Sequence, residues 1–289
     1  MLAVQRLSLR QAAAALAFLA AFAVLFWPTF CWMAERFDAL DSFYSHGWLV
    51  PLASAWLLWQ RREALRRITP HPSYSGLGLL VLSVTIHVLA TWWRVHWLSG
   101  FAMLGSIWGL VWTLWGRDVL RTVRVPMLFL LFMVPLPGVL LIAASFHLKM
   151  IAASLATRLL PFLGIAAHQV GSTIQVPGVS VIIDDTCSGL RSLISLIALS
   201  AFWTAIMPRA LKRWQQGLII AASIPIALAA NMVRILVLVL LAVLCGPQVA
   251  GGFIHFGSGI VVFGVALASL AWISQALLRL PAPEAAAPS

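Results

Sequence analysis

Charged residues are scarce in this chain. Asp, Glu, Lys and Arg make up only 9% of its 289 residues, whereas they make up roughly a quarter of a soluble domain. Apolar residues reach 62%, the mean hydropathy is +0.98, and several apolar runs have the ~20 residues that cross a bilayer core. These runs are continuous, whereas the strands of a membrane β-barrel alternate over about ten positions. The sequence therefore predicts an all-α, polytopic transmembrane helix bundle.

Several chemical signatures are also absent. The chain has three cysteines and no C-x-x-C pair, which argues against a thiol–disulfide oxidoreductase. No His or Cys pair has the spacing of metal ligands, and no Gly-rich phosphate loop occurs. We therefore expect neither a metal nor a cofactor. No internal repeat is visible, although many secondary transporters contain one.

The net charge of +11 does not indicate nucleic-acid binding, because the basic residues form short clusters between apolar runs. This is the positive-inside pattern, which sets the orientation of membrane spans. Three clusters lie within the chain, at 61–67, 117–124 and 209–213, and further basic residues lie at its ends: Arg6, Arg10 and Arg279. We place all of them in the cytoplasm.

This assignment predicts about seven full-length membrane spans and one short one in a single domain over 1–280, followed by a disordered tail over 281–289. We interpret the first apolar run as a retained span and not as a signal peptide. The runs that cross the membrane are 12–33, a short one at 46–60, then 76–94, 97–116, 125–142, a span starting near Cys187, 217–244 and 254–277. A polar-faced helix over 144–163 is expected in the outer interface, and 168–185 is expected to form an outer loop or small hairpin.

Polar residues of three different spans meet at the outer leaflet in this topology. Cys187 begins a span that runs inward, and His255 begins the last inward span. Arg234 lies in the outer half of a span that runs outward, with Asn231 one helical turn before it. Ionisable residues inside membrane spans are costly and mostly face a cavity or a partner. The topology therefore predicts a cluster of thiol, guanidinium and imidazole groups.

Such a cluster suits acyl transfer on a peptide. A thiolate is a strong nucleophile, an imidazole can move the proton, and a guanidinium stays charged and stabilises an oxyanion. Taken alone, His255 is also typical of an interfacial histidine. Cys187 alone is also typical of an inert buried thiol, or of one half of a disulfide with Cys245.

The residues around the cysteine have structural interpretations as well. Asp184 and Asp185 are expected to cap the helix that follows, because acidic residues at a helix start accept backbone N–H groups and favour the helix dipole. They are also candidates for orienting the imidazole or an arginine, or for binding a basic substrate segment. Arg191 lies one turn after Cys187, where it either lines the site or extends to the outer headgroups.

Five stretches, in order, resemble motifs of the exosortase/archaeosortase family. "TCSGLRSL" at 186–193 resembles its cysteine motif, although alanine more often precedes the cysteine in that family. "NMVRI" at 231–235 is similar to its arginine motif, and "IHFGSG" at 254–259 to its histidine motif. "YSHGWLVPL" at 44–52 and "VPLP" at 134–137 resemble two further family signatures.

The resemblance implies a multipass cysteine protease and transpeptidase in the bacterial inner membrane, with its site near the periplasmic leaflet. Its partners would be exported proteins with a C-terminal sorting tail: a Pro-Glu-Pro-type motif, a transmembrane helix and a basic end. Cleavage through a thioester would pass the new C-terminus to an amine on a lipid or another acceptor. By resemblance Cys187 is the nucleophile, Arg234 the stabilising cation and His255 the acid and base. The expected supporting or substrate-binding residues are Arg191, Asp184, Asp185, Asn231 and His46.

Two other functions compete with this one. The chain could be a multipass transporter whose arginines line an anion path, or an assembly subunit of an envelope polysaccharide export system. The role of an assembly subunit does not require the thiol. The sequence does not indicate an oligomeric state.

Overall fold

The chain folds as two compact units, each described by itself. Unit 1 consists of Met1–Ala39 and Leu58–Pro135, and unit 2 of Leu40–Leu57 and Leu136–Ser289. The computed structural model describes residues 9–39, 42–184, 187–207, 211–246 and 252–279, with side chains left out at 9–12, 14, 15 and 252–256. The prediction of a disordered tail therefore lies outside the described residues.

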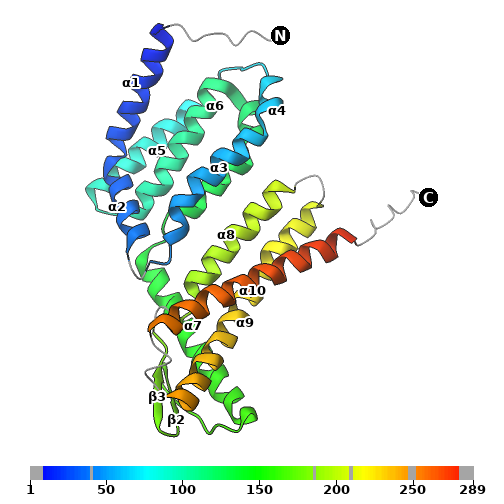
Figure 1. The fold of residues 1–289 in the computed structure, drawn as a ribbon. Helices are drawn as coiled ribbons and strands as arrows, with labels where there is room; N and C mark the ends of the chain where they lie inside the picture. The colour runs from blue at the N-terminus through cyan, green and yellow to red at the C-terminus, as the bar shows by residue number, and fades with distance from the viewer. Residues whose placement is uncertain (1–8, 40–41, 185–186, 208–210, 247–251, 280–289) are drawn as a thin grey trace, which may run out of the picture. The chain divides into compact units, whose positions relative to one another are not determined.

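Unit 1 is helical in its described part (Figure 1). Its elements are α1 (Leu9–Leu25), α2 (Trp27–Asp38), α4 (Arg62–Arg66), α5 (Ser75–Trp92), α6 (His96–Phe129) and the 3₁₀ helix η2 (Leu130–Met133), with the end of α3 (Leu49–Gln60). Helices α5 and α6 form a hairpin whose tight turn contains Arg94 in the left-handed conformation. Lipid tails are as apolar as the side chains of membrane helices, so the hydrophobic effect does not hold such a pair together. Close packing of the two backbones does so instead.

Glycines give the α5–α6 pair this close contact. A Cβ atom on Gly109 of α6 would lie 2.6 Å from the backbone nitrogen of Leu80 in α5. A Cβ atom on Gly76 of α5 would lie 2.5 Å from the backbone nitrogen of Thr113 in α6. Each glycine therefore fills a position where any side chain would push the two helices apart.

The first apolar run is a bent pair of helices, and not the single straight span over 12–33 that the hydropathy predicts. Helices α1 and α2 meet at an angle of 65°. Pro28, near the start of α2, has no N–H to continue the ladder of α1. The imidazole Nε2 of His87 donates to the carbonyl of Leu25 at 2.9 Å, so a polar group at the break is paired within the unit.

Two prolines also change the expected boundaries at the end of unit 1. The expected span over 125–142 is divided, because α6 and η2 end at Met133 and the next helix, α7 (Gly138–Leu159), starts after Pro135 and Pro137. The residues expected to form an interfacial helix, 144–163, belong to α7 and the following 3₁₀ helix η3 (Leu160–Leu163). That segment is apolar and long enough to cross a membrane.

The polytopic all-α class is confirmed. Among the described residues, five helices are long and apolar enough to cross a membrane, or six if the bent pair counts as one span. Two further expected spans are shorter helices. The 12 residues of α3 extend only about 18 Å and the 17 residues of α8 (Leu190–Ile206) about 26 Å, against a bilayer core of about 30 Å.

Unit 2 combines long helices with one small sheet. Its elements are the 3₁₀ helix η1 (Ser45–Trp48), the start of α3, α7, η3, β1 (His168–Val170), β2 (Thr173–Val176), β3 (Val179–Ile182), α8, α9 (Arg213–Cys245) and α10 (Gly252–Arg279). The three strands pair antiparallel in chain order, with His168 opposite Gln175 and Val176 opposite Val179. This sheet confirms the hairpin expected before the cysteine.

Two hydrophobic cores hold unit 2 together. The first joins the sheet to α7 and to the second half of α9, and it includes Ile174, Ile183, Val239 and Cys187. The second joins α8, α9 and α10 through Leu196, Ile219 and Leu270 among others. Both α8 and α10 pack against α9, so α9 is the helix that the two cores share.

The basic clusters lie together within each unit, as the positive-inside assignment requires. In unit 1, Arg61 Nη1 donates to the carbonyl of Thr122 at 2.8 Å, which joins the first two clusters. In unit 2, Gln215 Nε2 donates to the carbonyl of Leu277 at 2.8 Å. The basic start of α9 and the basic end of α10 therefore share one end of unit 2.

Gly109→Ala is expected to destabilise unit 1. The added methyl group meets the backbone of Leu80, and such overpacking costs on the order of 1–3 kcal/mol. Gly78→Ala in α5 is the matched control, because nothing lies within 4 Å of its Cβ position. Thermal unfolding of both variants in detergent should show a lower melting temperature for Gly109→Ala only; equal values would contradict the packing described here.

Candidate functional site

Cys187 lies in a tight turn just before α8. Its backbone N–H points at Asp184, 3.0 Å from the side-chain Oδ1 and 3.2 Å from the carbonyl oxygen. The side chain of Cys187 is buried, with 7% of the residue exposed. Asp184 therefore caps the turn that carries the cysteine and not, as the sequence predicted, the helix that follows, because α8 begins only at Leu190 after Gly189. Asp185 lies outside the described residues.

Asn231 of α9 joins this turn to the neighbouring helix. Its Nδ2 donates to the carbonyl oxygen of Cys187 at 2.9 Å, and the residue is 5% exposed. Gly189 makes the approach possible, because its φ of 79° lies in the left-handed region and a Cβ there would lie 2.8 Å from Asn231 Cγ. The sequence predicted Asn231 only as a supporting residue, and the structure gives it a specific partner.

Arg234 follows Asn231 by one turn on α9 and reaches α10. Its Nε donates to Ser258 Oγ at 3.4 Å, and a Cβ on Gly259 would lie 4.0 Å from the guanidinium carbon. His255 precedes Ser258 by one turn of α10, so the backbone places it near the start of the same helix. The side chain of His255 lies outside the described residues. The turn before α8, the middle of α9 and the start of α10 thus converge.

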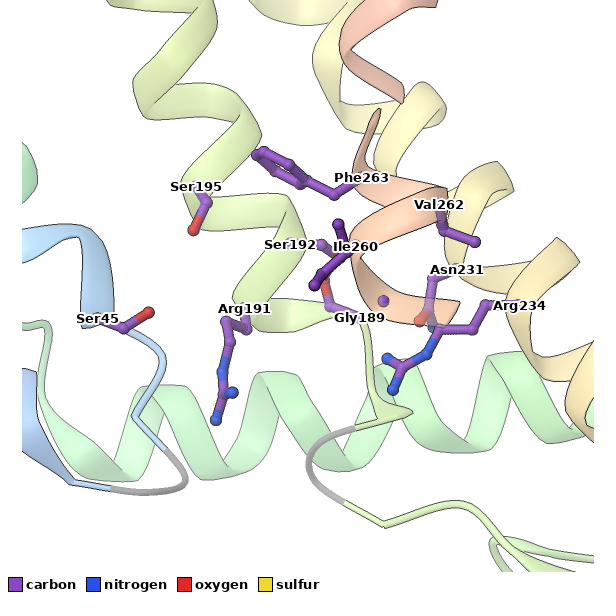
Figure 2. A pocket seen from close by; sticks show the side chains of 11 residues that line it. Ser45, Gly189, Arg191, Ser192, Ser195, Asn231, Arg234, Ile260, Val262 and Phe263 are labelled. Atoms are coloured by element: carbon purple, nitrogen blue, oxygen red, sulfur yellow. Dashed lines mark hydrogen bonds between the residues drawn. The ribbon is translucent and has the colours of Figure 1, made fainter. Parts of the chain in front are cut away.

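These elements surround a cavity of about 480 Å³ (Figure 2). Its polar lining is Ser45, Arg191, Ser192, Ser195, Asn231 and Arg234. On α10 the lining is mostly apolar, with Ile260, Val262 and Phe263. Gly189 also lines the cavity, so the wall begins two residues after Cys187. The buried cysteine is therefore adjacent in sequence to the cavity wall.

The segment around His46 forms another part of this wall. His46 Nδ1 lies 3.3 Å from Ser195 Oγ on α8, and the ring of Tyr44 stacks on the imidazole with centroids 5.7 Å apart. The Tyr44 hydroxyl accepts the backbone N–H of Leu136 at 3.2 Å. Burial raises the pKa of Tyr44, although this hydrogen bond opposes the rise, so the phenol stays neutral at physiological pH. These contacts fix Ser45 at the cavity.

A family model described as "Transmembrane exosortase" matches residues 32–272. The chain belongs to the transmembrane exosortase family. Neither the curated proteins nor the solved structures that were compared with the chain gave a match.

The family assignment makes this exosortase a multipass membrane protein from a family of membrane transpeptidases. The matched range includes the turn of Cys187, the Arg234 region of α9 and the start of α10. It also includes the segment of His46, whose contacts with α8 were not evident from the sequence. The roles of the individual residues remain predictions.

None of the three cysteines of this exosortase forms a disulfide. Cys31 and Cys245 are exposed, and Cys187 is buried. The sequence allowed a disulfide between Cys187 and Cys245, but the structure does not contain it. Within the described residues, no three His, Cys, Asp or Glu side chains are arranged to hold a metal ion.

Sequence reasoning missed Ser45 and Ser195. Ser195 lies one turn after Arg191 on α8, so helical spacing alone could have placed both on the cavity face. Ser45 had no comparable signal, because its segment meets α8 across nearly 150 residues of sequence. Only the fold brings them together.

Gly189→Ala is expected to disturb the site more than a glycine substitution of equal backbone strain. Both Gly189 and the control, Gly178, have a φ near 80°, but nothing lies within 4 Å of the Cβ position of Gly178. Alanine at either position costs on the order of 1–2 kcal/mol for the left-handed conformation. Only Gly189→Ala should also displace Asn231, which loosens the turn.

Two measurements test this difference. One is thermal unfolding, and the other is the rate of Cys187 alkylation in a protein that lacks Cys31 and Cys245. A larger fall in melting temperature and faster alkylation for Gly189→Ala than for Gly178→Ala are expected. Identical behaviour of the two variants would mean that Asn231 does not hold the turn.

Proposed function

We propose that this exosortase is a cysteine protease and transpeptidase that cleaves the C-terminal sorting tail of exported proteins and transfers the new C-terminus to an amine. The observation that carries the proposal is the connection from Cys187 through Asn231 to Arg234. Asp184 and Asn231 hold the backbone of the buried Cys187, two residues before the wall of a cavity that the Arg234 guanidinium lines. Acyl transfer needs this combination of nucleophile and cation.

The reaction divides into two steps. In the first, the thiolate of Cys187 attacks the scissile carbonyl carbon; the new C–S bond forms, the C–N bond breaks, and the departing amine takes a proton from His255. In the second, an acceptor amine attacks the thioester carbon, gives its proton back to His255, and releases the thiolate. The assignment of His255 is supported by its place on α10, one turn before the partner of Arg234.

Arg234 stabilises the oxyanion of both tetrahedral intermediates. A guanidinium stays protonated, and it acts strongly in a cavity with apolar walls because few water molecules screen it. Its hydrogen bond to Ser258 keeps it against α10. Negative charge on the thiolate is further favoured by the N-terminal end of α8, which begins three residues after Cys187.

The position of the cavity supports a site near the outer leaflet of the inner membrane. Arg234 lies about 30 Å along α9 from the basic residues at its start, close to the thickness of a bilayer core. With the basic end in the cytoplasm, the cavity lies on the periplasmic side. Exported substrates reach that side.

A second hollow supports a substrate with a membrane helix. It measures about 430 Å³, lies between α9 and α10, and has an almost wholly apolar lining that includes Val233, Val237 and Val261. Arg234 lines both this groove and the polar cavity. We place the helix of the sorting tail along the groove, with its Pro-Glu-Pro-type motif in the cavity and the acceptor amine arriving from the membrane surface.

Cys187→Ala is expected to abolish maturation of a reporter that carries a sorting tail, and Cys187→Ser is expected to leave at most traces. The nucleophile is lost in the first variant and weakened in the second. Cys31→Ala and Cys245→Ala are the controls, since both thiols are free and exposed. Co-expression with the reporter and immunoblotting for the shortened form measure the effect.

Normal maturation with Cys187→Ala would sink the enzymatic proposal and favour the role of an assembly subunit. The amount of each variant in the membrane is measured in parallel. A stable Cys187→Ser protein without activity separates loss of chemistry from loss of folding.

Arg234→Gln is expected to lower the rate of the first step by about a hundredfold to a thousandfold, the range for loss of one oxyanion donor. Arg158→Gln is the control, because Arg158 is an exposed arginine of α7 in the same unit. Single-turnover cleavage of a tail peptide by purified protein gives the rate. An equal rate for both variants would remove Arg234 from the mechanism.

A further inference from the structure

Two arginines of unit 1 lie close together although they come from different segments. Arg61, between α3 and α4, donates from Nη1 to the carbonyl oxygen of Thr122 in α6. Arg124 follows Thr122 by two residues on α6, and its positive charge repels that of Arg61. Burial of Arg61, and then this repulsion, lower the pKa of its guanidinium below the usual value. Because an arginine stays protonated even so, the pair concentrates positive charge between the two segments.

The acidic residues of the basic clusters at 61–67 and 117–124 lie next to other arginines. These form salt bridges within their own helices: Arg62 and Arg66 with Glu63, and Arg121 with Asp118. Among the residues that the structure describes, no Asp or Glu forms a salt bridge with Arg61 or Arg124. A half-buried cation next to a second cation is unfavourable without a counter-charge, so the pair favours an anion from outside the chain.

Exposed leucines lie about one helical turn from each arginine of the pair. In α3, Leu58 precedes Arg61 by three residues and is 40% exposed. In α6 and η2, Leu128 and Leu131 follow Arg124 by four and seven residues, so the three share one helix face. These two leucines are 46% and 40% exposed. Because α3 runs toward the basic clusters and the last part of α6 runs away from them, all three leucines lie on the membrane side of the arginines.

We propose that Arg61 and Arg124 bind the phosphate of an anionic phospholipid, whose acyl chains lie against Leu58, Leu128 and Leu131. Charge complementarity carries the inference, because guanidinium groups offer several N–H donors to phosphate oxygens and the lipid supplies the counter-charge. Basic sites between membrane helices on the cytoplasmic side bind lipid headgroups in this way. The bound lipid connects the end of α3 to α6. The site lies in unit 1 and does not depend on the proposed transpeptidase function.

A phospholipid fits this pair better than a soluble phosphate. Both ligands offer phosphate oxygens, but only a lipid also covers the exposed leucines. Trp59 of α3 marks the depth of the site, because it is 58% exposed and the guanidinium carbon of Arg62 lies 4.0 Å from the centroid of its ring. Tryptophan is enriched at the level of the headgroups, where one end of the side chain is apolar and the other is wet. Arg61 follows Trp59 by two residues, so the pair lies at the depth of a lipid phosphate.

Binding of phosphatidylglycerol to purified, delipidated full-length protein in detergent tests the site. Native mass spectrometry gives the affinity for the added lipid, and thermal unfolding gives the stabilisation that binding produces. Arg61→Gln and Arg124→Gln are each expected to weaken binding by about tenfold to a hundredfold, the loss for one charge-assisted hydrogen bond. Arg66→Gln and Arg121→Gln are the matched controls. Each removes the same charge from the same cluster, but from an arginine that has an acidic partner, so both should bind the lipid as the wild type does.

Equal weakening in all four variants would overturn the site, because the lipid would then respond only to the net charge of the clusters. So would an equal affinity for phosphatidylcholine, whose headgroup has no net charge, or an equal thermal shift with inorganic phosphate in place of the lipid. Arg61→Gln also loses the hydrogen bond to Thr122, which lowers its stability without lipid. Arg124→Gln keeps that bond and separates a lost lipid contact from a lost fold, and wild-type affinity in this variant would also overturn the site.

Discussion

The hydrogen bond from the Asn231 amide to the carbonyl of Cys187 is the contact on which the candidate site depends. Burying a side-chain amide inside an apolar helix bundle costs free energy unless the amide makes hydrogen bonds there. Here it is buried and bonded to the backbone of the turn that Asp184 holds from its own side. Gly189 removes the one side chain that would block the approach. The position of the thiol is therefore set by two hydrogen bonds of the Cys187 backbone, one to Asp184 and one to Asn231 of α9.

The rest of unit 2 keeps α9 in place for this contact. One core fastens the second half of α9 to the sheet and α7, and the other fastens its first half to α8 and α10. Cys187 belongs to the first core, while Arg234 reaches toward α10. The site thus lies where the two cores meet, and movement of α9 relative to either core would separate Cys187 from Arg234. Long apolar helices supply the rigidity that three chemical groups from distant segments require.

The sequence predicted the class of fold and the convergence of Cys187 with Arg234, because hydropathy and basic clusters determine the depth of each residue along its span. It did not predict helix boundaries at Pro28 or in 134–137, where a missing N–H ends a helix inside an apolar run that hydropathy treats as continuous. Side-chain contacts were out of reach for a different reason. The hydrogen bond from Asn231 to the turn of Cys187, and the position of Ser45 beside α8, depend on the packing of segments far apart in sequence.

Arg234 lines both the polar cavity and the apolar groove, and this shared position bears on how a substrate would bind. The polar cavity suits a peptide motif, and the apolar groove between α9 and α10 suits the helix attached to it. In the proposed function, a substrate that fills both would contact Arg234 from two sides. Binding energy from the helix, which does not react, can then be used to position the motif over the thiol, so a tail without its helix should lose turnover as well as affinity. The proposed selection of a membrane-anchored substrate and the proposed catalysis would then depend on the same guanidinium.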